Sequence, residues 1–493
     1  MEHTNTITTL DKEPIPQTME IGTAIGHRMM ADDPDNPLNW PLHRKIYVSA
    51  VAWAFGSVVA FGITGYTAGI TGVMAEFDVS MTTAVSGMSL VLFGIAFAPI
   101  ITPHLSEAFG RVPVYMVSLP IFSLFILGAG LSQSFASLAI CRFFAGFFGG
   151  WCLVLIEGTF ADVWAEHATV TYYSILGLSS YFGAACGPII CGFVFAAKGW
   201  RWTQWVTLML ALAAYLLGIG APETYPRAVM RARAKRLGQT PNIKPAQSGA
   251  TIPEMFQVTV VEPVKMFFTD PIVTIATIYL GFNFAVVFQW FISVPVVLHL
   301  VYNFSVQQAG LAFIAAIVGA LLAALMSIMI DRIVSPKQYR KTNNGQVRFE
   351  YRLWPAMIGG FLVMTSLFWI GWTASPKVSW QSPVIGTMLF VWGNLSIIIG
   401  TVSYLFDAYP ARGTLSALTS AACFRLLMAG FLPLVIIKMI MNLTGAWTYS
   451  LFGFLAVVAI PMPFILYFLG PKFRASSRHS RDNMARRDTD ATV

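Results

Sequence analysis

Charge is scarce in this chain. Asp, Glu, Lys and Arg make up only 11% of its 493 residues, whereas an ordinary soluble domain carries roughly 25%. Hydrophobic residues make up 56%, and the mean hydropathy is +0.66. So little charge over so long a chain excludes a soluble globular protein and indicates a membrane protein with many spans.

Cysteine is also rare, and the common patterns of metal and hydrolase chemistry are missing. The five cysteines all lie in long hydrophobic runs, away from loops where oxidation could pair them, so we expect no disulfide and no metal site. The sequence has no HExxH, Asp-rich pair or GxSxG pattern, which argues against an integral-membrane enzyme and predicts no cofactor. No basic-then-apolar start is present in the first 45 residues, so we expect no cleavable signal peptide.

Twelve hydrophobic runs are each long enough to cross a membrane, because a hydrocarbon core of roughly 30 Å requires about 20 residues of helix. An even number of spans places both termini on one side. The runs begin near Ile46, Ala84, Val114, Leu138, Thr171, Thr203, Ile272, Gly310, Leu353, Val384, Leu415 and Trp447.

Lysine and arginine are distributed unevenly between the two sides. Of the 31, three lie in loops of one side and three within spans or at their ends on that side, which leaves 25 on the other face. The positive-inside rule assigns that face, with both termini, to the cytoplasm. The net charge of +8 therefore needs no nucleic acid to explain it. Two glycosylation sequons, at Asn303 and Asn442, fall in predicted outer loops and agree with this topology.

The runs predict two groups of six spans around a long polar loop. This loop contains a basic helix over 227–236, which would suit an anionic inner leaflet. Bundles with internal repeats place their substrate at the interface of the halves near mid-membrane. The expected organisation is a disordered cytoplasmic tail (1–45), a six-helix bundle (46–222), a cytoplasmic central loop (223–270), a second six-helix bundle (271–470) and a cytoplasmic tail (471–493).

Charged groups recur at corresponding short turns of the two halves, which hints at a repeat. The turn after span 2 carries Glu107 and Arg111, and the turn after span 8 carries Asp331 and Arg332. Asp162 lies about one turn past the inner end of span 4, within reach of Arg111. Interfacial carboxylates of this kind stay hydrated, so a gate or a surface ion pair is favoured over a proton carrier. The predicted gating residues are Glu107, Gly110, Arg111, Asp162, Asp331 and Arg332.

Three ionisable residues inside spans are the strongest candidates for the transport pathway. Insertion of an arginine at a helix centre costs roughly 2.5–3.5 kcal/mol, so Arg142 and Arg425 need partners. At 100° per residue, Arg142 and Glu157 share one helix face, which predicts that this face lines a polar cavity with Glu157 as a proton or substrate site. The alternative is that Arg142 extends outward to the interface and Glu157 makes a structural pair.

Several uncharged polar residues also lie near mid-membrane depth and are candidates for the pathway. Each of them has the alternative of simple packing or lipid contact, because the whole chain is rich in aromatic residues. The candidates are Gln289, Asn283, Tyr404 and Asn394.

Span 5 carries small residues at a spacing of four. Gly183 and Gly187 lie on one stripe, which lets a neighbouring helix approach closely. Pro188 removes a backbone hydrogen bond and bends the helix. With Gly192, these residues predict a tightly packed and bent span; ordinary small-residue packing explains the glycines but not the Gly-Pro pair.

These motifs resemble those of fungal transporters of the major facilitator superfamily, in the drug:proton antiporter family with twelve spans. The strip from Leu105 to Arg111 is similar to the loop 2–3 motif of the superfamily, and Arg142 matches the arginine of the span 4 motif. The segment from Gly187 to Gly192 resembles the span 5 antiporter motif. The resemblance runs from about residue 33 to residue 477.

The resemblance implies an all-α integral membrane fold, with twelve transmembrane helices in two pseudo-symmetric six-helix bundles. It implies a proton-coupled antiporter that exports a small organic molecule, such as a xenobiotic, secondary metabolite or organic acid, from a fungal cell. We expect a monomer in the plasma membrane, with protons and membrane lipid as its other partners. An uncoupled facilitator and an exporter dedicated to one organic acid are the alternatives.

The chain departs from the family pattern at two informative places. Glu107-Ala108 stands where the loop 2–3 motif usually has Asp-Arg, so Arg111 is left as the gating cation. Relatives that resemble polyamine exporters carry an acid shortly before the proline of span 7, and the segment 292–295 has none. A neutral or anionic organic substrate is therefore favoured over a polycation.

Overall fold

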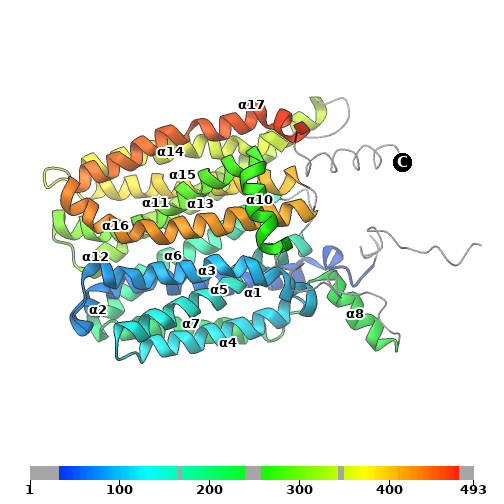
Figure 1. Cartoon of the computed structure of the whole chain (residues 1–493), viewed down its shortest axis with the longest axis horizontal. Helices are drawn as coiled ribbons and strands as arrows, with labels where there is room; N and C mark the ends of the chain where they lie inside the picture. Colours follow the sequence, from blue (N-terminus) through cyan, green and yellow to red (C-terminus); the bar gives the residue numbers. More distant parts are fainter. Residues whose placement is uncertain (1–32, 165–168, 239–256, 342–348, 410, 477–493) are drawn as a thin grey trace, which may run out of the picture.

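The computed structural model describes residues 33–164, 169–238, 257–341, 349–409 and 411–476, which form a bundle of long helices (Figure 1). Within these ranges, ten segments are long and apolar enough to cross a membrane. The last of them, Ser416–Arg474, crosses twice because the backbone turns at Thr444, where φ is 71°. Together with α7 (Arg201–Gly218), whose first turn is polar, they form the twelve predicted spans.

The first half of the chain supplies six of these spans. Its first span breaks near the end into a short 3₁₀ turn and then continues as a short helix. The elements are η1 (Pro37–Asn39), α1 (Leu42–Thr64), η2 (Gly65–Gly69), α2 (Ile70–Phe77), α3 (Met81–Phe109), α4 (Arg111–Gly130), α5 (Phe135–Val163), α6 (Thr169–Lys198) and α7 (Arg201–Gly218).

The central loop and the second half supply the remaining elements. The elements are α8 (Pro226–Arg236), η4 (Gln257–Val261), α10 (Glu262–Thr269), α11 (Pro271–Tyr302), α12 (Val306–Leu311), α13 (Ile314–Lys341), η5 (Phe349–Leu353), α14 (Trp354–Thr373), α15 (Gln381–Ala408), α16 (Ala411–Ala459) and α17 (Pro461–Ser476).

The two halves lie side by side and meet along two seams. In Figure 1 the blue-to-cyan first half lies below the green-to-red second half. Helix α3 packs against α16 along one seam, and α6 packs against α13 along the other. This is the arrangement of two six-helix bundles that the sequence predicted.

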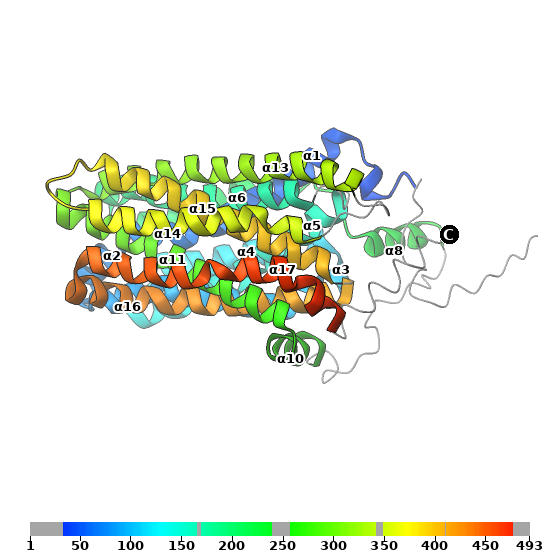
Figure 2. The ribbon, with the colours of Figure 1, turned by 90° about the horizontal axis from the view of Figure 1, so that it is seen from above.

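The ends of the bundle differ in what they carry. Both ends of the described chain, together with α8 and α10, lie at one end, which we call the terminal end (Figures 1 and 2). The short helices α2 and α12 lie at the other, which we call the far end. The predicted assignment of the terminal end to the cytoplasm remains a prediction. Of the predicted tails at 1–45 and 471–493, residues 1–32 and 477–493 lie outside the described residues, and residues 33–45 include η1 and the start of α1.

Two segments differ from the prediction, one in where its helix ends and the other in what its side chains contact. Helix α17 continues through Pro471 to Ser476, past the predicted boundary at 470, because Arg474 forms an ion pair with Glu350 at 2.5 Å. The predicted basic helix is α8, and two of its arginines, Arg231 and Arg233, bind other parts of the protein. Arg231 donates hydrogen bonds of 2.9 Å to the last carbonyls of α3, which lack partners within their helix.

Glycines set the closest helix contacts in the first half. Helices α3 and α5 cross where Gly94 faces the backbone of Phe143 and Gly146 faces the backbone of Val91. A Cβ at either glycine would overlap a carbonyl oxygen of the other helix. Small residues of this kind allow the close backbone packing that holds helices together in lipid.

Replacing Gly94 or Gly146 by alanine tests this contact. The new methyl group would force the helices apart, and we expect a loss of about 1–3 kcal/mol of stability. The measurement is the melting temperature of the purified protein in detergent. Gly445→Ala is the control, because its new Cβ would meet only Val297 Cγ2, at 3.7 Å. Unchanged melting temperatures for both G94A and G146A would show that the two helices do not pack this closely.

Candidate functional site

A cavity of about 400 Å³ lies between the two halves. Helices α1, α3, α4, α5 and α6 line it from the first half, and α11, α15 and α16 line it from the second. Most of its wall is apolar, including the rings of Phe284, Phe288, Phe291 and Phe406. The polar and charged lining residues are Thr64, Thr102, Arg111, Glu157, Tyr173, Ser180, Tyr181, Thr419 and Arg425.

Glu157 and Arg425 form an ion pair across this cavity. Glu157 belongs to α5 and Arg425 to α16, so the pair connects the two halves. Arg425 Nη2 lies 3.8 Å from Glu157 Oε1, too far for a hydrogen bond. The guanidinium carbon of Arg425 lies 4.7 Å from the centre of the Phe284 ring. Arg425 Nε is buried and has no hydrogen-bond partner among the described residues.

A second link between the halves lies beside the cavity wall. The hydroxyl of Tyr181 on α6 donates to Asn394 Oδ1 on α15 at 2.5 Å. Asn394 Nδ2 donates to the carbonyl of Asn283 at 3.0 Å, and Asn283 Nδ2 donates to the carbonyl of Tyr279 at 2.8 Å. This chain of hydrogen bonds orients Tyr181, which is the member that lines the cavity.

Four predicted pathway residues lie outside the cavity wall. Asn283 and Asn394 are buried behind Tyr181, because their amides satisfy each other and the backbone of α11. Gln289 is fully buried in α11, and neither of its amide atoms has a hydrogen-bond partner in the described part of the chain. Tyr404 is fully buried in α15, with its hydroxyl near Gly470 of α17. None of these four side chains is among the lining residues.

The prediction that Arg142 faces the cavity is wrong. Its side chain is fully buried, its Nη1 donates to the Gly62 carbonyl at 2.8 Å, and its guanidinium carbon lies 4.2 Å from the centre of the Tyr66 ring. Helix α1 ends at Thr64, so the carbonyls of its last turn lack intrahelical donors. A cation at a helix C-terminus satisfies such a carbonyl and the helix dipole together. Arg142 therefore holds the break in the first span.

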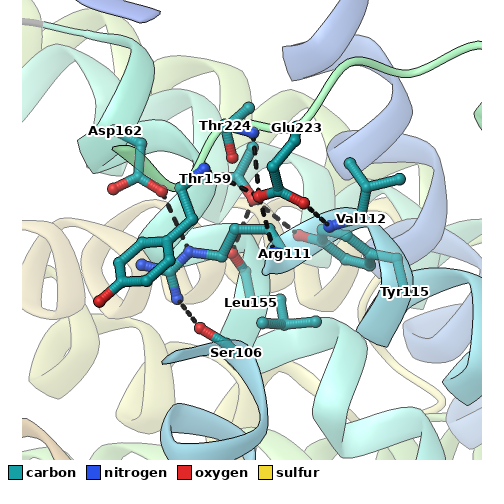
Figure 3. Close-up of polar contacts among 10 residues, drawn as sticks. Ser106, Arg111, Val112, Tyr115, Leu155, Thr159, Asp162, Glu223 and Thr224 are labelled. Atoms are coloured by element: carbon teal, nitrogen blue, oxygen red, sulfur yellow. Dashed lines mark hydrogen bonds and ion pairs between the residues drawn. The ribbon is translucent and has the colours of Figure 1, made fainter. Parts of the chain in front are cut away.

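Arg111 lies at the centre of a polar cluster at the terminal end of the first half (Figure 3). Its Nε lies 3.0 Å from Asp162 Oδ2, the contact that the sequence suggested, and its Nη1 donates to Ser106 Oγ at 2.7 Å. The carboxylate of Glu107 forms no ion pair within the described residues. Burial and this carboxylate raise the pKa of Tyr225, whose ring lies 5.2 Å below the Arg111 guanidinium.

Glu223 completes this cluster, and the sequence reasoning missed it. Its carboxylate accepts hydrogen bonds from the backbone N–H groups of Arg111 at 2.8 Å and Val112 at 3.1 Å, at the start of α4 (Figure 3). An anion at a helix N-terminus is favourable, and the N-cap residue, Gly110, has no side chain to play this part. Gly110 has φ of 101°, and a Cβ there would lie 2.5 Å from Glu223 Oε2.

The second half carries a matching cluster around Arg352. Its Nε lies 2.9 Å from Asp407 Oδ2, and its Nη1 lies 2.5 Å from Asp331 Oδ1. The predicted gating cation Arg332 is exposed and forms no ion pair within the described residues. The sequence reasoning missed Arg352, although it lies at the start of its span, as Arg111 lies at the start of α4. Aligning the sequences of the two halves would have found it, because Arg352 then stands at the place of Arg111.

The comparisons with known proteins agree with this architecture. The family model of the Major Facilitator Superfamily matches residues 52–429. The citrinin biosynthesis cluster MFS transporter mrr1 of Monascus ruber is 32% identical over 461 residues, covering 91% of each chain. Polyamine transporter 4 of Saccharomyces cerevisiae is 30% identical over 479 residues, covering 91% of this chain and 72% of its own.

Solved structures show the same fold at low sequence identity. The xylose transporter XylE from E. coli, in a partially occluded inward open conformation, gives a TM-score of 0.61 at 16% identity. The match covers 86% of this chain and 99% of that one. The family match and the curated relatives describe transporters and not enzymes. The chain belongs to the Major Facilitator Superfamily of membrane transporters.

Proposed function

We propose that this chain is a proton-coupled antiporter that exports a small organic molecule from a fungal cell. The observation that carries the proposal is the ion pair between Glu157 and Arg425, which joins the two halves inside the cavity. A carboxylate at the moving interface lets protonation change the attraction between the halves. We place the protein in the plasma membrane as a monomer, with its terminal end in the cytoplasm.

The conformation supports loading from the terminal end. The cavity reaches Pro103, Arg111 and Ala161, which lie near the terminal ends of α3, α4 and α5. Toward the far end, α12 and α13 lie against α6, and a Cβ at Gly310 would approach the Pro188 carbonyl to 2.6 Å. Contacts that close leave no passage between these helices.

The proposed cycle alternates the charge state of Glu157. With Glu157 ionised, its attraction to Arg425 stabilises the conformation described here, in which substrate enters from the cytoplasm. After the halves rock and substrate leaves on the outside, Glu157 takes a proton, and the cavity returns inward in that state. The proton and the substrate shift the balance between the inward and outward conformations because each binds the two conformations with different affinity.

The names of the relatives support an organic metabolite as cargo. Besides the citrinin cluster transporter, the ascochitine biosynthesis cluster MFS transporter of Didymella fabae is 30% identical over 457 residues. A polyamine, as in the name of the yeast relative, fits the site less well. Arg425 lies in the cavity wall and would repel a polycation.

The two terminal-end clusters are proposed to act as gates that stay within their own halves here. Arg111 binds Asp162 and Ser106, and Arg352 binds Asp331 and Asp407, so each cluster fixes the spacing of three spans in its half. These pairs keep the cytoplasmic ends of each half rigid while the halves rock past each other.

Glu157→Gln tests proton coupling. We expect it to abolish export driven by a pH gradient, because a neutral amide cannot alternate between charged and protonated states. The transported compound is first identified by comparing metabolites released by a deletion strain and its parent, and flux is then measured in proteoliposomes with and without the gradient. The control is Glu262→Gln, an exposed carboxylate on α10. Full gradient-driven flux in E157Q would contradict the assignment, and wild-type flux indifferent to the gradient would indicate a facilitator.

Arg352→Gln tests the gate of the second half. Removing the guanidinium takes from two partly buried aspartates the cation that lies within 2.9 Å of each, so we expect about 1–3 kcal/mol of lost stability. The measurements are the melting temperature and the transport rate, and both are expected to fall. Arg332→Gln is the matched control, because Arg332 is exposed. Equal behaviour of R352Q and R332Q would remove the proposed role of Arg352.

A further inference from the structure

Arg425 is the arginine of the cavity wall that has neither a close carboxylate partner nor a full set of hydrogen bonds among the described residues. Arg111 and Arg352 have carboxylate partners at 3.0 Å or closer. Arg142 also keeps buried nitrogens without partners, but it does not line the cavity. Arg425 has one carboxylate at 3.8 Å and a buried Nε with no partner among the described residues. It therefore offers donors to whatever occupies the cavity.

Glu157 is poorly satisfied as well. Its carboxylate accepts no hydrogen bond from the described residues, and 31% of its side chain is exposed. The charged and titratable groups that face it are Arg425 on α16 and Tyr172 and Tyr173 on α6. The Glu157 carboxylate, an acceptor, and the Arg425 guanidinium, a donor, thus face each other at 3.8 Å without forming a hydrogen bond.

We propose that the cavity binds a neutral, largely apolar molecule carrying a hydrogen-bond acceptor beside a donor, and that this pair bridges Arg425 and Glu157. The acceptor, such as a carbonyl, takes a hydrogen bond from the guanidinium, and the donor, such as a hydroxyl or amide N–H, gives one to the carboxylate. The rest of the molecule lies against the phenylalanine rings of the wall. The inference rests on the proposed function and names the class of its substrate.

Charge balance favours a neutral molecule. Glu157 and Arg425 already cancel, and the wall around them is mostly apolar, so a third charge would be desolvated without compensation. A cation would lie close to Arg425. An anion would compete with Glu157 for Arg425 and so favour its protonation. Ligand and proton would then travel together, the opposite of exchange.

A neutral ligand with a hydrogen-bond donor couples to the proton in the direction that an antiporter requires, because ligand binding and protonation of Glu157 then oppose each other. The donor bonds more strongly to the ionised carboxylate of Glu157 than to the carboxylic acid, because charge-assisted hydrogen bonds are the stronger ones. A proton on that carboxylate therefore weakens binding of the ligand. Binding to the protonated protein therefore favours release of a proton from Glu157 to water. Proton and substrate oppose each other's binding at one carboxylate, and no redox or covalent step is involved.

The test uses three probes that share one aromatic body: 2-naphthamide, 2-naphthoate and 2-naphthylmethylammonium. Binding to the purified full-length protein is measured by calorimetry between pH 5 and pH 8, in buffers that differ in ionisation enthalpy. We expect the neutral amide to bind at least about tenfold tighter than either ion, because it alone makes both hydrogen bonds. Its affinity is expected to fall as the pH falls, with release of one proton.

Variants separate the bridging role from general stability. Glu157→Gln is expected to remove the pH dependence and the proton release, and Arg425→Gln to weaken the amide about tenfold through loss of its acceptor contact. Lys438→Gln is the matched control, because this exposed cation lies on the same helix as Arg425 and outside the cavity wall. It is expected to bind like the wild type.

Several results would overturn the inference. Tighter binding of the naphthoate or the ammonium, proton uptake on binding, or no amide binding at millimolar concentration would each do so. Amide binding without gradient-driven flux in proteoliposomes would overturn the proposed function and leave the substrate class standing. Gradient-driven flux of a charged metabolite would overturn the substrate class and leave the proposed function standing.

Discussion

The low polarity of the membrane interior is the constraint on which this structure depends. A charge inside the bundle has no water to solvate it, so each buried ion must find its partner in protein. Arg111, Arg142 and Arg352 find theirs within their own halves, at hydrogen-bonding distance. The pair between Glu157 and Arg425 crosses between halves and is longer, at 3.8 Å. Charge therefore stiffens each half and binds the two halves weakly to each other.

This division explains how the molecule can have rigid halves that still move. Within the first half, glycines let α3 and α5 pack backbone against backbone. Between the halves at the terminal end, aromatic side chains meet instead, as where Tyr173 lies 6.1 Å from the Phe406 ring. Backbone packing resists separation because it loses many contacts at once, whereas side chains at a seam can change rotamer. At the terminal end, rocking at the seams is consequently easier than distortion within a half.

The architecture could be predicted from the sequence because it depends on the lengths and spacing of apolar runs. Twelve runs and a long polar loop were sufficient to predict two six-helix bundles. Glu157 could be selected because a carboxylate in a span is costly and rare. Helical periodicity does not show which neighbour a face meets, so Arg142 was wrongly placed toward the cavity, and its true partner is a backbone carbonyl. Partners far apart in sequence, such as Glu223 with the start of α4, leave no periodic signal.

The two halves repeat one electrostatic design with different residues. Each terminal-end cluster contains one arginine at the start of a span, paired with an aspartate near the end of the next: Arg111 with Asp162, and Arg352 with Asp407. The second carboxylate differs, since Glu223 caps a helix in the first half and Asp331 binds the guanidinium directly in the second.

One segment ties the halves together outside the cavity. The strap of η4 and α10 contacts α3 through His104 and Thr259, and contacts α16 through the stacked rings of Phe267 and Phe424, 5.3 Å apart. Figure 2 shows α10 at the side of the bundle at its terminal end. Phe424 is the neighbour of Arg425 in the sequence. Because α3 and α16 belong to different halves, any widening of their seam at this end must break one of the strap's two contacts. The chain between the halves is thus placed to respond to the proposed rocking that would separate Arg425 from Glu157.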